Sequence, residues 1–144
     1  MIVADFRDEI INKKGGFGMS KRCEVYRCAV CGAVVEVVRG GGGTLYCCGQ
    51  PMERMEEHAK DVGVEKHLPV VEKVEGGYRV KVGQVPHPML VEHHIEWIEL
   101  LTPQGVQRQL LPATGKPEVV FQTEESPIAA RAFCNLHGLW RSEW

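Results

Sequence analysis

Four cysteines in a short, glycine-rich stretch constrain this chain more than any other feature of its sequence. Cys28 and Cys31 form a C-x2-C pair, and the adjacent Cys47 and Cys48 follow a loop that contains the run GGGG at 40–43. The surrounding module, residues 22–58, contains two short β-prone runs but little else to build a core. Chains below about 40 residues usually need disulfides or a metal to fold. We therefore expect a bound metal to hold this module together.

The four thiolates suit a tetrahedral site. A C-x2-C turn brings two sulfurs to one ion, and the hairpin that follows can return the second pair to complete the tetrahedron. Zinc and a single iron both accept four thiolates, and the spacing leaves both open. Zinc ribbons usually present two spaced C-x2-C pairs. Neighbouring cysteines, in contrast, must splay along one backbone and would distort the tetrahedron. Cys23 is left over and is interpreted as an ordinary thiol.

Charge and hydropathy exclude several classes of protein. The net charge of −2 over 144 residues lacks the basic excess of a nucleic-acid binder. No stretch approaches the roughly 18 apolar residues of a membrane span, and the acidic start MIVADFRDEII shows no export signal. We therefore expect a cytoplasmic protein. Thiols stay reduced there, which favours metal sites over disulfides for the six cysteines.

The sequence divides into three parts. Residues 1–21 are expected to form an N-terminal extension, because residues 1–18 carry no motif and Met19 offers a second plausible start. Residues 22–58 form the cysteine module, and residues 59–144 form a second domain. The polar stretch 56–63 is interpreted as a linker, in which His58 would be solvated.

The second domain shows the period of β-strands. Residues 78–82 alternate apolar and basic side chains after a glycine pair that predicts a hairpin, and turn signals at 102–105 and 113–117 separate further β-prone runs. In the run 93–98, His93 would share one strand face with Ile95 and Trp97, and His94 would face the other way. Several short strands without a long amphipathic helix predict an antiparallel β-sandwich in an all-β chain.

Histidines form a second candidate metal site in this domain. Four of them lie in suggestive contexts, and one belongs to a C-x2-H chelate. The set is His67, His87, His93, His137 and Cys134. Four imidazoles and a thiolate describe a five-coordinate transition-metal site, and an octahedron would keep one position open, as catalytic sites do. His94 competes with His93, but adjacent strand residues face opposite ways, and we favour His93.

These residues resemble a known family, the desulfoferrodoxins, which are two-iron superoxide reductases. The segments YRCAVCG, CCGQPM, EKHLPV, GGYRVKVG, HPM, HIEWIEL and CNLHGLW carry the resemblance, in that order, from about residue 22 to residue 144. The resemblance is specific because two unrelated metal motifs occur together with the expected order and spacing.

The resemblance implies a desulforedoxin-like domain followed by an immunoglobulin-like antiparallel β-sandwich. It implies a rubredoxin-type iron held by Cys28, Cys31, Cys47 and Cys48, and a second iron with His67, His87, His93 and His137 as equatorial ligands and Cys134 as the axial ligand. It further implies reduction of superoxide to hydrogen peroxide by a homodimer that rubredoxin supplies with electrons. Glu65 and Lys66 match the family's glutamate and lysine near the open iron position.

Two alternatives remain at this point. The protein could be a non-enzymatic electron carrier whose histidine site is coordinatively closed, or a structural protein with zinc in both sites. The departures from the family pattern are the leading residues, the extra Cys23, and His94 where an aromatic residue is expected. All nine expected metal ligands are present.

Overall fold

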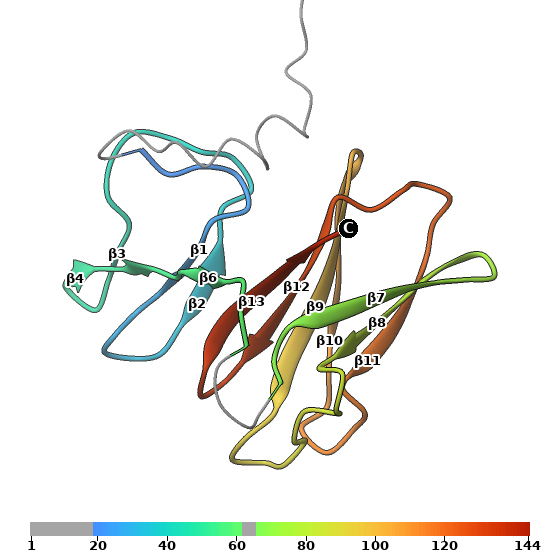
Figure 1. The fold of residues 1–144 in the computed structure, drawn as a ribbon. Coiled ribbons are helices and arrows are strands. Elements are labelled where there is room, and N and C mark those ends of the chain that lie inside the picture. Colours follow the sequence, from blue (N-terminus) through green and yellow to red (C-terminus); the bar gives the residue numbers. More distant parts are fainter. Residues whose placement is uncertain (1–18, 62–65) are drawn as a thin grey trace, which may run out of the picture. The chain divides into compact units, whose positions relative to one another are not determined.

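A computed structural model of the chain describes residues 19–61 and 66–144, and every regular element within these ranges is a β-strand (Figure 1). The all-β prediction is therefore confirmed. The chain forms two compact units, one ending at Met55 and one running from Glu56 to Trp144. The described residues contain no helix that is long and apolar enough to cross a membrane. The expected extension up to residue 18 and Glu65 lie outside the described residues.

The first unit is built from short antiparallel pairs. Its strands are β1 (Val25–Arg27), β2 (Val34–Glu36), β3 (Tyr46–Cys47), β4 (Gln50–Pro51) and β5 (Glu53–Arg54). They form a sheet in the order β2-β1-β5 and a separate β3-β4 pair. Val25 and Val37 are buried, whereas Val30 and Val38 are 63% and 82% exposed. This unit buries few apolar side chains, as expected of a module that a metal stabilises.

The second unit is a two-layer sandwich (Figure 1). Its strands are β6 (Glu57–His58), β7 (Pro69–Val74), β8 (Gly77–Val82), β9 (Ile95–Thr102), β10 (Gly105–Leu110), β11 (Glu118–Gln122), β12 (Ala129–Cys134) and β13 (Gly138–Glu143). One sheet has the order β10-β9-β12-β13-β6 and the other the order β11-β8-β7. All pairs are antiparallel except β6 with β13.

The core lies between the two sheets and follows the predicted alternation. Tyr78, Val80 and Val82 of β8 are buried there, and Arg79 and Lys81 between them are only half-buried. Opposite them, β12 presents small side chains, Ala130 and Ala132, and then Cys134. The same apolar surface that holds the sheets together therefore continues to one of the candidate metal ligands.

Because of a β-bulge, the side chains at the start of β9 do not face the way that the sequence predicts. Strand β9 begins at Ile95, so His93 precedes it. Phe133 of β12 lies opposite Trp97, but the next residue, Cys134, lies opposite Ile95. The extra residue on β9 shifts the alternation. Ile95 therefore belongs to the core between the sheets, whereas Trp97 stacks on Phe133, and the predicted shared face is wrong.

The linker interpretation of residues 56–63 is also wrong at its start. Glu57 and His58 form β6, which pairs in parallel with Leu139 and Trp140 of β13. His58 is half-buried rather than solvated, and its ring contacts the Trp140 ring at a centroid distance of 4.8 Å. A two-residue strand in a polar stretch owes its structure to this pairing, which leaves no periodic signal in the sequence.

Charged residues are buried on the larger sheet. Glu99 of β9 and Arg131 of β12 have 0% and 1% of their side-chain surfaces exposed, and Arg131 Nη2 lies 2.7 Å from Glu99 Oε2. Arg108 Nη2 contacts the other carboxylate oxygen at 2.6 Å. Glu57 contacts Arg131 at 3.8 Å and Arg141 at 3.2 Å. These contacts fix β6 to the sheet and satisfy the buried carboxylate of Glu99.

Candidate metal centres

The four cysteines of the first unit come together at the ends of two turns. Their sulfur atoms lie within 4.8 Å of one another, with 3.7 Å between Cys31 and Cys47 and 3.9 Å between Cys47 and Cys48. Four sulfurs at about 2.3 Å from one metal in a tetrahedron are about 3.8 Å apart. All four thiols are free of disulfide bonds. The donor set therefore fits a tetrahedral metal such as iron or zinc.

Backbone geometry explains how adjacent cysteines share one site. Cys48 has a φ of 52°, in the left-handed region that residues other than glycine rarely adopt, and Gly49 follows at 76°. This turn lets both Cys47 and Cys48 face the C-x2-C pair. On the other side, the backbone N–H of Cys31 donates to the sulfur of Cys28 at 3.5 Å.

These contacts perturb the thiols. The pKa of Cys28 is lowered to about 6, first because the Cys31 N–H stabilises its thiolate. The pKa of Cys47 is raised to about 12, first by its hydrogen bond with the Cys28 sulfur. The pKa of Cys48 is raised, first by its hydrogen bond with Cys31. The lowered pKa favours the thiolate of Cys28, and a metal would displace the protons that Cys47 and Cys48 retain.

The second group is assembled from four separate segments of the sandwich. His67 precedes β7, His87 lies in the β8–β9 connection, His93 lies two residues before the start of β9, and Cys134 and His137 flank the β12–β13 turn. One ligand atom from each of these five residues lies within 4.8 Å of the others. The set fits iron, copper, zinc or nickel by donor chemistry, because it combines imidazoles with one thiolate.

The four imidazoles form a closed cycle. Ring centroids are 4.6 Å apart for His67 and His87, 4.8 Å for His87 and His93, 5.0 Å for His93 and His137, and 4.9 Å for His137 and His67. His67 Nε2 and His137 Nδ1 are 3.1 Å apart, close to the about 3.0 Å between two nitrogens bound at right angles to one metal. The Cys134 sulfur lies 3.8 Å from His137 Nδ1.

Hydrogen bonds outside the group orient its members. His87 Nδ1 donates to the carbonyl oxygen of Pro88 at 2.7 Å, which leaves Nε2 of the neutral ring as the metal-binding atom. The carboxylate of Asp61 accepts from the backbone N–H of His67 at 2.6 Å and of Leu68 at 3.2 Å. Asp61 thereby holds the segment that carries His67.

Asn135 connects the C-x2-H turn to the segment before β9. Its side-chain oxygen accepts from the backbone N–H of His94 at 2.9 Å, and its side-chain nitrogen donates to the carbonyl of Glu92 at 3.0 Å. The ring of His94 bonds the Leu90 carbonyl through Nδ1 at 2.9 Å and stands outside the five-residue group. The structure thus brings His93 to the group and gives His94 a local partner.

The group is buried on one side and open on the other. Cys134 is fully buried, and His67 and His87 are each 3% exposed. His93 is half-buried and His137 is exposed. Next to His137, Leu136 is 59% exposed. A small anion or the surface of another protein can therefore approach the group from the side of His137.

Lys66 lies beside this group in the chain, directly before His67, and is half-buried. Its backbone packs closely against Gly83, which has a φ of 82°. A Cβ atom at position 83 would lie 2.7 Å from the Lys66 carbonyl oxygen and 3.0 Å from its Cβ. The Val85 carbonyl oxygen would be closer still, so glycine at 83 permits the close approach of these backbone segments.

Sequence patterns did not indicate Asp61, Asn135 or Trp140. The ring of Trp140 stacks on that of His67, with centroids 4.4 Å apart and planes at 14°. Asn135 and Trp140 lie inside the segment CNLHGLW, and their closeness in sequence to the candidate ligands of that segment could have identified them. Asp61 contacts the backbone of a residue six positions further along the chain, and no spacing rule identifies it.

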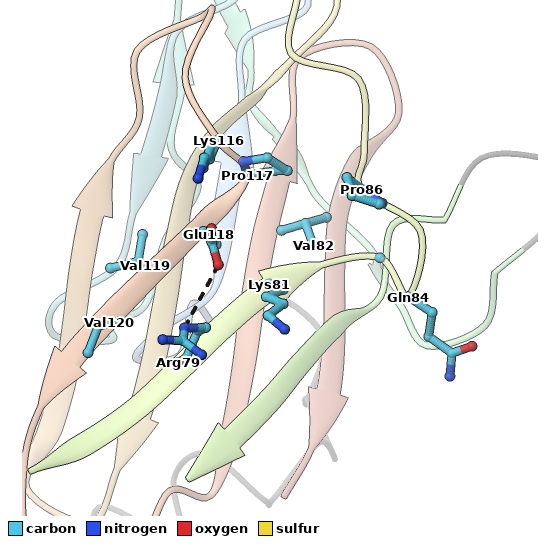
Figure 2. A pocket seen from close by; sticks show the side chains of 11 residues that line it. Arg79, Lys81, Val82, Gln84, Pro86, Lys116, Pro117, Glu118, Val119 and Val120 are labelled. Atoms are coloured by element: carbon cyan, nitrogen blue, oxygen red, sulfur yellow. Dashed lines mark ion pairs between the residues drawn. The ribbon is translucent and has the colours of Figure 1, made fainter. Parts of the chain in front are cut away.

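A hollow of about 850 Å³ lies elsewhere on the sandwich, along β8 and β11 (Figure 2). Arg79, Lys81 and Lys116 line it together with Glu118, and Arg79 lies 3.9 Å from the Glu118 carboxylate. Lys81 bonds Glu72 at 2.9 Å. The acidic side chains offset much of this positive charge, and none of the nine candidate ligands lines the hollow. The two metal groups are the stronger functional candidates.

Comparison with known proteins relates both units of the chain to one family. The family model Desulfoferrodoxin matches residues 59–143, and the model of the desulfoferrodoxin N-terminal domain matches residues 20–55. A desulfoferrodoxin of Desulfarculus baarsii is 50% identical over 125 residues, which cover 87% of this chain and 99% of that protein. A desulfoferrodoxin of Syntrophotalea carbinolica is 49% identical with the same coverage.

A solved structure extends the likeness to the fold. The crystal structure of the superoxide reductase from Treponema pallidum superposes with a TM-score of 0.70 at 32% identity, covering 83% of this chain and 97% of that one. The two-part architecture is therefore shared with an experimentally determined structure.

Proposed function

The chain belongs to the desulfoferrodoxin family, and from this premise we propose that it is a superoxide reductase, an oxidoreductase that converts superoxide to hydrogen peroxide. The single observation that supports this most strongly is the group of four imidazoles and one thiolate within 4.8 Å of one another. Iron in this group would supply one electron to superoxide, which takes up two protons and leaves as hydrogen peroxide.

We assign the iron ligands as expected from the sequence. Cys28, Cys31, Cys47 and Cys48 hold a rubredoxin-like iron, called the tetrathiolate centre below. The catalytic iron, called the histidine centre below, is held by His67, His87, His93, His137 and Cys134. The domain limits stay a prediction at 22–58 and 59–144. The observed division after Met55 supports moving residues 56–58 to the catalytic domain.

The residues around the catalytic group have separate tasks. The thiolate of Cys134 is a strong anionic donor to the metal, and its complete burial keeps water away from the sulfur. The ammonium group of Lys66 attracts the superoxide anion. At about 4 Å this attraction amounts to roughly 1 kcal/mol in water and roughly 4 kcal/mol at an effective dielectric constant near 20. Glu65 is the carboxylate proposed to lie near the open position.

Electrons arrive from another protein in this proposal, and the donor is of the rubredoxin type. The exposed ring of His137 and the exposed side chain of Leu136 beside it support docking at this edge. A homodimer is proposed from the family resemblance. The cytoplasm is the proposed location, because six free cysteines suit a reducing compartment.

Rapid mixing of the reduced, iron-loaded protein with pulse-generated superoxide tests the proposal. We expect bimolecular oxidation with one hydrogen peroxide formed per superoxide and no release of dioxygen. An electron carrier with a closed histidine site would show no such reaction, and that result would refute the assignment. Metal analysis with a visible spectrum separates iron from zinc, because zinc thiolates are colourless.

Lys66→Ala tests electrostatic attraction. We expect the second-order rate with superoxide to fall roughly fivefold, the equivalent of ~1 kcal/mol, and its dependence on ionic strength to weaken. Lys73→Ala removes the same charge from an exposed position on β7 and serves as the matched control. Equal effects in both variants would show that only net charge matters.

Glu65→Ala tests the carboxylate separately. We expect the absorption spectrum of the oxidised histidine centre to change, while that of the tetrathiolate centre stays the same. An unchanged spectrum would remove Glu65 from the metal's surroundings.

A further inference from the structure

Trp140 makes two contacts with the catalytic group from a single side chain. Its indole ring stacks on the imidazole of His67 at 4.4 Å and 14°, and its Nε1–H donates to the carbonyl oxygen of His137 at 3.1 Å. His67 comes from the segment before β7 and His137 from the β12–β13 turn. One buried residue therefore joins two ligands that lie 70 residues apart in the chain.

The position of Trp140 in the sheet explains these contacts. It pairs with Ala132 of β12, which lies in the core between the sheets, so both side chains occupy the same face. The small side chain of Ala132 leaves room for the indole, and Trp140 is only 7% exposed. The indole thus fills the end of the sandwich nearest to His67.

The ring of His58 supports the indole from β6, which pairs with β13 on the side away from β12. His58 of β6 lies opposite Trp140 in the parallel pair, and the two ring centroids are 4.8 Å apart. The carboxylate of Glu57 keeps β6 in place through Arg131 and Arg141. The rings of His58, Trp140 and His67 therefore form a continuous series of contacts from a half-buried strand to a metal ligand.

We propose that Trp140 is a positioning residue of the catalytic iron centre, which fixes the ring plane of His67 and the backbone of His137, with His58 as its support. The proposal rests on the ligand assignment of the proposed function. Ligands that outside contacts hold in place bind metal more tightly, because less freedom is lost on binding. Removing Trp140 should therefore weaken the histidine centre specifically, beyond any loss of stability.

The chain offers a matched control. Trp97 lies on the same sheet, is 8% exposed and stacks on Phe133 with centroids 5.5 Å apart and planes at 15°. Its stacking partner is not among the proposed ligands. Trp140→Leu and Trp97→Leu therefore remove equally buried indoles, of which Trp140 stacks on a proposed ligand and Trp97 stacks on Phe133. The tetrathiolate centre provides an internal reference within each variant.

The experiment follows iron loss from the full-length, iron-loaded protein to an excess of chelator, together with the visible spectrum and the melting temperature. We expect Trp140→Leu to speed iron loss from the histidine centre by about 10- to 100-fold, the usual cost of losing an outer contact to a metal ligand. The absorption band of this centre should also shift. Trp97→Leu should lower the melting temperature without changing either property, and both variants should keep the spectrum of the tetrathiolate centre.

Milder variants decide the matter if Trp140→Leu does not fold. Trp140→Phe keeps a ring for stacking and loses the N–H donor, so it should retain most of the absorption band and lose iron faster than wild type. His58→Ala should act in the same direction with a smaller effect. Wild-type rates and spectra in both variants, or equal changes in Trp97→Leu and Trp140→Leu, would overturn the proposal.

These readouts need no superoxide. A protein that holds iron but does not react with superoxide would refute the proposed function and leave the role of Trp140 standing. The reverse result, normal reduction of superoxide with iron loss insensitive to Trp140, would refute only the positioning role.

Discussion

The two metal groups are built by opposite strategies. In the first unit, two local turns supply all four sulfurs, and Cys31 and Cys48 remain exposed in a module with few buried apolar side chains. In the second unit, the five donors come from four segments that a packed sandwich core brings together. We therefore expect a metal to hold the first fold together, whereas the packed core of the second fold holds its candidate metal site together.

Removal of iron should have the largest effect, and it should affect the two units differently. Structural metals in small modules contribute about 10–16 kcal/mol of apparent binding energy, so the first unit should unfold when stripped while the sandwich persists. Amide NMR spectra of the full-length protein measure both units at once. Reloading with zinc should restore the first unit. Dispersed amide signals from residues 22–55 in the metal-free protein would contradict the comparison.

Glu99→Gln should lower the stability of the second unit alone. The change removes the nearer carboxylate from the buried Arg131, which keeps only the longer contact with Glu57 at 3.8 Å, and removal of one partner of a buried pair costs about 3–5 kcal/mol. All three tryptophans lie in the second unit, so their fluorescence reports its unfolding, while the absorbance of the tetrathiolate centre reports the first. This absorbance should survive at denaturant concentrations that unfold the sandwich.

A matched surface change controls this prediction. Glu75→Gln alters an exposed carboxylate in the β7–β8 turn, where the effect should stay within about 0.5 kcal/mol. Equal destabilisation by both changes, or simultaneous loss of the absorbance of the tetrathiolate centre, would show that the two units do not unfold independently.

The smallest expected effect concerns a surface pair of the sandwich. The pKa of Glu72 is lowered from 4.5, first by its hydrogen bond with Lys81. A lowered folded-state pKa adds stability above the unfolded-state value, and this stability is lost as the pH falls through the folded-state value. Above pH 4.5, the melting temperature of wild type should be slightly higher than that of Lys81→Met. This difference should vanish at lower pH. A pH-independent difference would indicate a packing effect instead.

Local chemistry made much of the site predictable. A C-x2-C pair and a C-x2-H pair are chelates at the level of the sequence, and the alternating side chains of residues 78–82 locate the strand that was found at Gly77–Val82. Four histidines in suggestive contexts were grouped with Cys134 from the sequence, and the resemblance to desulfoferrodoxins then gave them the roles of iron ligands. These features depend on neighbours within a few residues, which a sequence displays directly.

Features that depend on distant partners were missed or misjudged. Strand β6 exists because β13 pairs with it, so the polar residues around His58 were interpreted as a linker. The bulge opposite Cys134 shifted the facing of Ile95 and Trp97. Asp61 contacts the His67 backbone six positions further along the chain. In each case the tertiary structure, rather than local periodicity, determines the outcome.

The close approach of Gly83 to Lys66 has a consequence for how this protein can diverge. A Cβ atom at 83 would lie 2.7 Å from the Lys66 carbonyl oxygen and closer still to that of Val85, and the φ of 82° adds strain of its own. Gly41 and Gly42 of the cysteine module have open space around them. We therefore expect Gly41 and Gly42 to tolerate substitution, whereas any side chain at position 83 would force the neighbouring backbone to move.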